Sequence, residues 1–163
     1  MKIDGVEIDL FGDTDPKKMP LHFFFGAKQI DYSTAQRADT SKQNSSVAPR
    51  HWYIDSVFKC SDCLEDFVFS ASEQRYWYED RKFYVASIPK RCATCRRLNR
   101  TKLELRQRYD QMIEIALARQ CPLDMKKQVI EIIDELEAAE GSISEGIKQN
   151  HAILLAQIAR EAT

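Results

Sequence analysis

Two Cys-x-x-Cys pairs constrain the fold of this chain more than any other feature of its sequence. The pairs are Cys60-Ser61-Asp62-Cys63 and Cys92-Ala93-Thr94-Cys95, and 28 residues separate them. Two cysteines three positions apart can direct both sulfurs to one point when the chain makes a tight knuckle. Two such knuckles would supply the four thiolates of a closed tetrahedral zinc site. The spacing therefore predicts one structural zinc ion bound by Cys60, Cys63, Cys92 and Cys95.

The same cysteines allow other interpretations. Iron is held by the same sulfur tetrahedron, and the sequence does not distinguish it from zinc. Redox chemistry of the thioredoxin type needs one pair at a strand-to-helix junction, not two pairs flanking a ribbon. A catalytic zinc is disfavoured because four cysteines leave no position open for water or substrate. The fifth cysteine, Cys121, precedes Pro122, and we interpret it as a small buried apolar side chain.

Length and composition are those of a foldable, soluble protein. The 163 residues are 44% hydrophobic and 30% charged, which suits one domain or a small domain with helical attachments. The sequence has no apolar run of about 18 residues, and residues 1–8 lack the apolar core of a signal peptide. We therefore expect a cytoplasmic protein without membrane contact, in which the cysteines stay reduced.

The N-terminal segment, residues 1–50, is predicted to be an arm with a flexible linker. Asp4-Gly5 is a turn signal, and Val6, Ile8 and Leu10 alternate after it, which indicates a small hairpin. The three phenylalanines at 23–25 are expected to pack on another surface. Residues 33–46 contain almost nothing to bury, and we interpret them as the linker.

The middle segment, residues 51–98, is rich in aromatic residues. Ten of the 16 aromatic side chains lie between Trp52 and Tyr84. Short strands are predicted over 52–58, 67–69 and 82–87, and the capping box Ser70–Glu73 predicts one inserted helix. Because a small zinc domain has few other residues with which to build a core, the aromatic cluster is interpreted as that core.

The last segment, residues 99–163, is predicted to form about three helices. Leu98, Leu105 and Tyr109 begin an apolar stripe at helical spacing, and Pro122 and Gly141 mark the helix ends. The expected fold class is therefore α+β. It consists of a small four-cysteine zinc ribbon with short antiparallel strands and one inserted helix, followed by a C-terminal helical bundle or hairpin.

Further residues follow a distinctive order between the two cysteine pairs. The order is the aromatic strand Phe67-Val68-Phe69, then Glu73-Gln74, then Trp77-Tyr78, then Arg91 before and Arg96 after the second pair. Because their motifs follow this order, residues 51–98 resemble the probable zinc-ribbon domain of small bacterial proteins. The resemblance covers 48 of the 163 residues. It implies one zinc ion on the four cysteines and no particular enzymatic activity.

The chain departs from the pattern of this family immediately after the first pair. Such knuckles commonly carry glycine after the second cysteine, whereas this chain has Leu64 there and no glycine from residue 27 to residue 140. The first knuckle must therefore turn without the conformational freedom of glycine.

A basic stripe follows the second pair. Residues 90–108 contain eight basic side chains and Glu104, a net charge of +7 in 19 residues. The stripe could contact the phosphates of a nucleic acid. It could equally form a solvated helix face that pairs with acidic residues and compensates the charge of the metal centre. We favour the second interpretation because the net charge of the whole chain is -1.

The sequence predicts a non-enzymatic zinc-binding interaction module that docks a protein partner or a second copy of itself. The alternative is a nucleic-acid-binding protein that uses the basic stripe. An enzyme is disfavoured because no general base or open metal position is evident. The candidate nucleic-acid contacts are Arg91, Arg96, Arg97, Arg100, Lys102 and Arg106.

Overall fold

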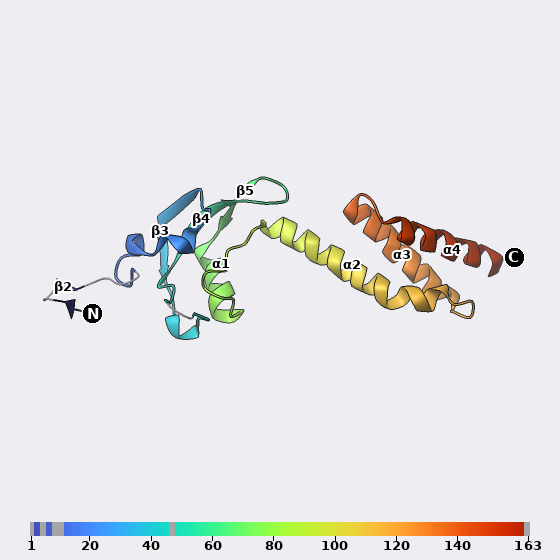
Figure 1. Ribbon diagram of the computed structural model, residues 1–163, viewed down its shortest axis with the longest axis horizontal. Coiled ribbons are helices and arrows are strands. Elements are labelled where there is room, and N and C mark those ends of the chain that lie inside the picture. Colours follow the sequence, from blue (N-terminus) through green and yellow to red (C-terminus); the bar gives the residue numbers. More distant parts are fainter. Residues whose placement is uncertain (1, 4–5, 8–11, 46–47, 162–163) are drawn as a thin grey trace. The chain divides into compact units, whose positions relative to one another are not determined.

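The computed structural model describes residues 2–3, 6–7, 12–45 and 48–161 (Figure 1). The chain divides into two compact units, Met1–Ala93 and Thr94–Thr163. The first contains two small sheets and several short helical segments, and the second contains helices. The observed class is the predicted α+β.

The predicted N-terminal hairpin is present. Strands β1 (Lys2–Ile3) and β2 (Val6–Glu7) pair antiparallel, with Ile3 opposite Val6. The predicted turn at Asp4-Gly5 and the positions of Ile8 and Leu10 lie outside the described residues.

The main sheet of the first unit has three antiparallel strands in the order β3-β4-β5. They are β3 (Gln29–Arg37), β4 (Trp52–Lys59) and β5 (Asp66–Phe69). The central strand is the most buried, because Tyr53, Ile54 and Phe58 all enter the core. The sheet thus places the end of β4, and with it the first cysteine pair, next to β5.

The flexible linker that the sequence indicated over residues 33–46 is corrected by the structure. Residues 33–37 belong to β3, and Thr40–Lys42 form the short 3-10 helix η3. The polar side chains there bond to the backbone in place of apolar packing. Thr34 Oγ1 donates to Asp31 O (2.8 Å) and accepts from Asp55 N (2.9 Å), at the point where the β3–β4 register shifts.

The core of the first unit is aromatic, as predicted. Phe23 and Phe24, in the 3-10 helix η2 (Leu21–Phe24), pack with Tyr53, Phe69 and Tyr78, whereas Phe25 is exposed. The chain itself therefore covers two of the three phenylalanines of this patch, Phe23 and Phe24, and leaves Phe25 exposed.

The inserted helix begins where the capping box predicted. Helix α1 (Ala71–Arg75) starts after Ser70, whose Oγ accepts from Glu73 N (3.2 Å), and it continues as the π-helical turn η4 (Tyr76–Asp80). The strand predicted over 82–87 is wrong. Lys82 adopts a left-handed φ of 57°, and Tyr84 forms only an isolated bridge to Asn44.

The second unit consists of α2 (Ala93–Leu117), α3 (Leu123–Glu140) and α4 (Glu145–Glu161). Helices α3 and α4 lie side by side (Figure 1). Gly141 ends α3 in the left-handed conformation (φ 78°), and its N–H donates to Glu137 O (2.9 Å). The core residues of this unit are Leu105, Tyr109, Ala116, Cys121, Val129, Ile132, Ile133, Leu136, Ile143 and Leu154.

Candidate metal centre

The first cysteine pair forms a knuckle between β4 and β5. Cys60 directly follows β4, and its N–H donates to Glu65 O (2.9 Å). Leu64 N in turn donates to Cys60 O (3.2 Å). These two bonds close the turn and direct Cys60 and Cys63 to the same side.

The second pair lies at the start of a helix. Cys92 immediately precedes α2, and Cys95 lies in its first turn. Residues three apart on a helix lie on one face, so the pair needs no second knuckle of the kind the sequence interpretation assumed. Ser61 N donates to Lys90 O (2.9 Å), which joins the first knuckle to the segment that leads into the second pair.

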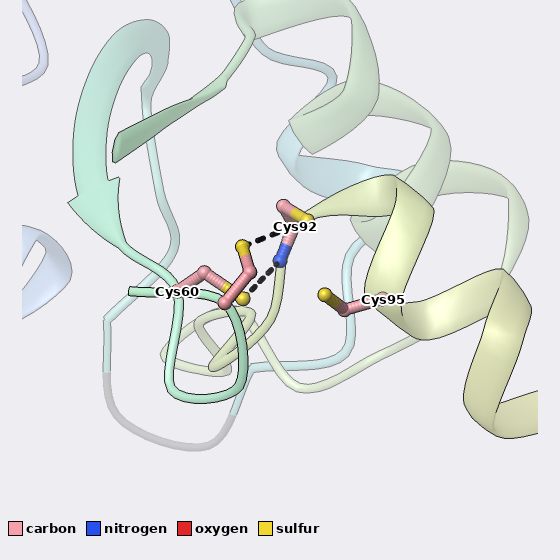
Figure 2. Close-up of side chains that lie close together, drawn as sticks. Cys60, Cys92 and Cys95 are labelled. Carbon is pink, nitrogen blue, oxygen red and sulfur yellow. Dashed lines mark hydrogen bonds between the residues drawn. The ribbon is translucent and has the colours of Figure 1, made fainter. Parts of the chain in front are cut away.

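The four cysteines that the sequence predicted as ligands do come together. Their Sγ atoms all lie within 4.8 Å of one another, and Cys63 Sγ is 4.0 Å from Cys92 Sγ. Zn–S bonds of about 2.3 Å in a tetrahedron require sulfurs about 3.8 Å apart, so the spacing fits zinc. Figure 2 shows the Cys60, Cys92 and Cys95 side chains turned toward one another. Together with Cys63 they would hold one structural zinc ion, and no described residue joins them as a fifth ligand.

The surroundings of Cys60 favour the thiolate that a metal requires. Cys60 is buried, and burial acts to raise the pKa of its thiol. Hydrogen bonds to the sulfur from the backbone at Cys63, Cys92 and Asp62 outweigh burial and lower this pKa to about 6. The Cys92 N–H lies 3.3 Å from Cys60 Sγ. Because a metal ligand must be deprotonated, this donor arrangement prepares Cys60 to bind a cation.

An ion pair connects the two cysteine segments beside the centre. Arg91 Nε lies 2.7 Å from Asp62 Oδ2, and both side chains are partly exposed. Four thiolates and one zinc ion carry a charge of -2, so nearby cations such as Arg91 stabilise the loaded centre.

Leu64 adopts the conformation that glycine would take at this position. Its φ is 63°, in the left-handed region, and its side chain is largely exposed. A left-handed backbone costs a residue with a Cβ about 1–2 kcal/mol. The departure from the family's glycine therefore leaves the direction of the turn unchanged and adds strain to the knuckle.

Leu64→Gly is expected to stabilise the zinc-loaded protein by about 0.5–1 kcal/mol, because relief of strain exceeds the entropy that glycine loses on folding. Leu64→Ala is the matched control, since alanine loses the same exposed side chain and keeps the strain. Chemical denaturation of both variants measures the difference. If Leu64→Gly is no more stable than Leu64→Ala, the left-handed strain is absent.

The Glu-Gln motif serves the fold of this domain. Gln74 is fully buried, and its amide bonds to β4 at both Ile54 N (3.2 Å) and Ile54 O (2.6 Å). It also donates to Phe69 O (2.8 Å) at the end of β5. One amide thus ties α1 to two strands. The sequence singled out Gln74 without indicating this role, because its partners lie up to 20 residues away.

Tyr78 and Arg50 form a second buried polar contact that the sequence did not predict. Tyr78 Oη donates to Ser87 O (2.6 Å) and accepts from Arg50 Nη1 (2.8 Å). Arg50 Nη2 donates to Phe23 O (2.8 Å), and the guanidinium lies 5.2–5.3 Å from the ring centroids of Phe23, Phe24 and Tyr78. Burial lowers the pKa of Arg50. Tyr78 of the sequence motif therefore helps to hold Arg50, at the end of the N-terminal segment, in the core.

The candidate nucleic-acid contacts fall into two groups. Arg91 pairs with Asp62, and Arg106 forms a bidentate pair with Glu140 at the end of α3 (2.6 Å for both bonds). This pair lowers the pKa of Glu140 through the hydrogen bonds that Arg106 donates. Arg96 also has an interaction within the chain. Arg97, Arg100 and Lys102 form no ion pair with any residue that the structure describes.

Cys121 lies apart from the metal centre, in the connection between α2 and α3. It is buried within the core of the second unit, and its Sγ lies 3.7 Å from Pro122 O. The interpretation of Cys121 as a small buried side chain agrees with this position.

Comparison with known proteins identifies the zinc-binding region. Residues 54–103 match the family described as "Probable treble clef domain", and this range includes all four cysteines. No curated protein and no solved structure gives a significant match to the chain. Among the described residues, no helix has the length and apolar character needed to cross a membrane. Residues 54–103 therefore carry a treble clef zinc-binding domain with one structural zinc site on Cys60, Cys63, Cys92 and Cys95.

Proposed function

We propose that this chain is a non-enzymatic interaction module in which zinc holds the start of α2 in place for a protein partner. Four cysteines complete a tetrahedral zinc site and leave no coordination position for a substrate. The buried polar groups of the motif, Gln74 and Tyr78, are bonded within the fold. These features favour a structural role for the domain.

The observation that carries the proposal is the exposure of the first turns of α2. The helix has 25 residues, a length of about 37 Å, whereas α3 has 18 residues and is about 27 Å long. Leu98 continues the stripe of Leu105 and Tyr109, yet it is 47% exposed while they are 6% and 7% exposed. The start of α2 therefore offers an apolar stripe that its own helical unit leaves uncovered.

The chemistry of this surface indicates the kind of partner. Leu103 is 56% exposed on a different side of the helix from Leu98, and the basic residues Arg97, Arg100 and Lys102 lie in the same turns of α2. A protein segment with apolar and acidic side chains would complement this surface. A second copy of the chain is a variant of the same proposal, because α3 carries exposed acidic residues such as Glu135 and Glu137.

A nucleic acid is the second candidate partner of the same surface. The specific observation in its favour is that Arg97, Arg100 and Lys102 form no ion pair with a described residue. Arg106, by contrast, already binds Glu140, so it is a poor candidate for a phosphate contact.

Two double variants separate the candidates. Leu98→Glu with Leu103→Glu removes the apolar contacts, and Arg97→Gln with Arg100→Gln removes two cations from the same turns. Light scattering measures self-association. Capture from nuclease-treated extract measures protein binding, and titration with a DNA or RNA duplex at rising salt measures phosphate contacts.

The proposal predicts that the leucine variant loses a specific partner or the dimer, while both variants keep zinc and helix content. Tight nucleic-acid binding that falls steeply with salt, and that only the arginine variant loses, would instead establish the second candidate. A monomer that captures no specific protein and binds no nucleic acid would contradict both.

A further inference from the structure

A separate pocket lies within the helical unit, away from the start of α2. It has a volume of about 380 Å³, within the usual range for small-molecule sites. Residues from the end of α4, the first turn of α3 and the α2–α3 connection form its walls. The lining residues are Arg119, Lys126, Ile153, Ala156, Gln157, Arg160 and Glu161.

Lys126 is the unusual residue of this pocket. Its side chain is 1% exposed, although lysine is among the residues least often buried. Its only ion-pair partner among the described residues is Glu161, whose side chain is 40% exposed. An ammonium has three donors and is costly to remove from water, so one carboxylate satisfies it only in part.

The pocket carries an excess of positive charge. Arg119 and Arg160 also line it, and neither forms an ion pair with a residue in the described part of the chain. Three cations against the single carboxylate of Glu161 leave a net charge of +2. These charges come from three different elements, so the excess is a property of the tertiary fold and not of one helix face.

Gln157 adds an unsatisfied polar atom. Its Nε2 donates to Leu117 O (3.2 Å), while its Oε1 is buried and accepts no hydrogen bond from any residue described. Buried polar atoms are nearly always bonded, to protein, water or a ligand. Ile153 and Ala156 supply an apolar wall beside these polar groups.

We infer that this pocket binds a small organic anion, a carboxylate on a short apolar body. The anionic group would lie among Arg119, Lys126 and Arg160, and the apolar body would contact Ile153 and Ala156. Lys126 already binds one carboxylate here, that of Glu161. This pairing favours a carboxylate as the anionic group of the ligand. This inference concerns a different surface from the docking of a partner and stands independently of it.

Titration of the ¹⁵N-labelled full chain tests the inference, with hexanoate as the probe. Saturable amide shifts are expected at Lys126, Ile153 and Gln157. Hexylammonium has the same number of carbon atoms and the opposite charge, and it should not produce them. Inorganic phosphate, which lacks the apolar body, should bind more weakly than hexanoate.

Variants of the pocket cations complete the experiment. Arg119→Gln and Arg160→Gln alter exposed side chains and should each weaken hexanoate binding by about tenfold or more, since each removes a charge-assisted hydrogen bond. Lys126→Met should abolish binding without lowering the melting temperature, because it replaces a buried charge with an apolar side chain of similar length. Arg108→Gln, an exposed cation outside the pocket, should leave binding unchanged.

Three results would overturn the inference. They are equal shifts from hexanoate and hexylammonium, phosphate binding as tight as hexanoate, and hexanoate binding that survives in the arginine variants. Circular dichroism on every variant shows whether the helices are intact, and the two exposed arginine variants keep the test decisive if Lys126→Met fails to fold.

Discussion

Replacing Cys60 with serine is expected to abolish zinc binding and to unfold residues 54–93. Zinc bound by four thiolates contributes about 10 kcal/mol or more to the folding of small zinc domains, which is comparable to the whole stability of a typical domain. Cys60 is the most buried ligand, so its loss also leaves a poorly bonded polar group inside the knuckle. Native mass spectrometry measures the zinc content directly.

The helical unit should survive this substitution. Its core, which includes Leu136 and Leu154, has no residue in common with the core of the first unit. The amide spectrum should therefore keep dispersed signals from α3 and α4 and lose those from β4 and β5. Cys121→Ser is the matched control and should retain one zinc ion per chain. A Cys60→Ser protein with zinc still bound and β4 intact would contradict the four-thiolate site.

Gln74→Leu is expected to destabilise the first unit by about 1–3 kcal/mol, because the substitution leaves Ile54 N without the bond that the amide supplies and a buried unpaired backbone group costs about 1–3 kcal/mol. Phe69 O loses less, because Phe69 is also paired with Ser56 in the β4–β5 ladder. Ile54 O loses less, because it also accepts from Ser56 Oγ (3.0 Å). Thermal and chemical denaturation of the zinc-loaded protein measure the loss.

Ser72→Leu is the control for this prediction. Ser72 is exposed on the same helix, so the change should alter the stability by no more than about 0.5 kcal/mol. If the two substitutions lower the stability equally, the loss comes from a change in helix α1 and not from the missing Gln74 bonds. Zinc content should stay at one per chain in both variants, which separates this effect from loss of the metal.

The residues that could be read from the sequence are those whose roles depend on local spacing. The Cys-x-x-Cys pairs predicted the four ligands because three-residue spacing brings two sulfurs together in either a knuckle or a helical turn. Ser70 predicted the start of α1, and Gly141 the end of α3, because capping bonds join residues at most four positions apart. The aromatic cluster predicted a core because so many large rings in a short segment have to be buried.

The polar strand β3 and the amide of Gln74 could not be predicted in this way. Strand β3 has few apolar residues, and its pairing with β4 depends on a chain segment about 20 residues away. Gln74 resembles an ordinary helix residue until Ile54 and Phe69 are placed beside it. In both cases the backbone partners are distant in sequence, and local patterns contain no information about them.

The sequence by itself determined the metal ligands, the aromatic core and the three helices, because each has a local signal: the Cys-x-x-Cys spacing, the density of aromatic residues and the helical spacing of apolar residues. Only the tertiary structure decided that the second cysteine pair begins a helix, that Leu64 takes a left-handed turn, and that Lys126 is buried. Those features arise when distant segments pack together. A lysine on a helix is usually exposed to water. Lys126 is buried because residues of α4 pack beside it.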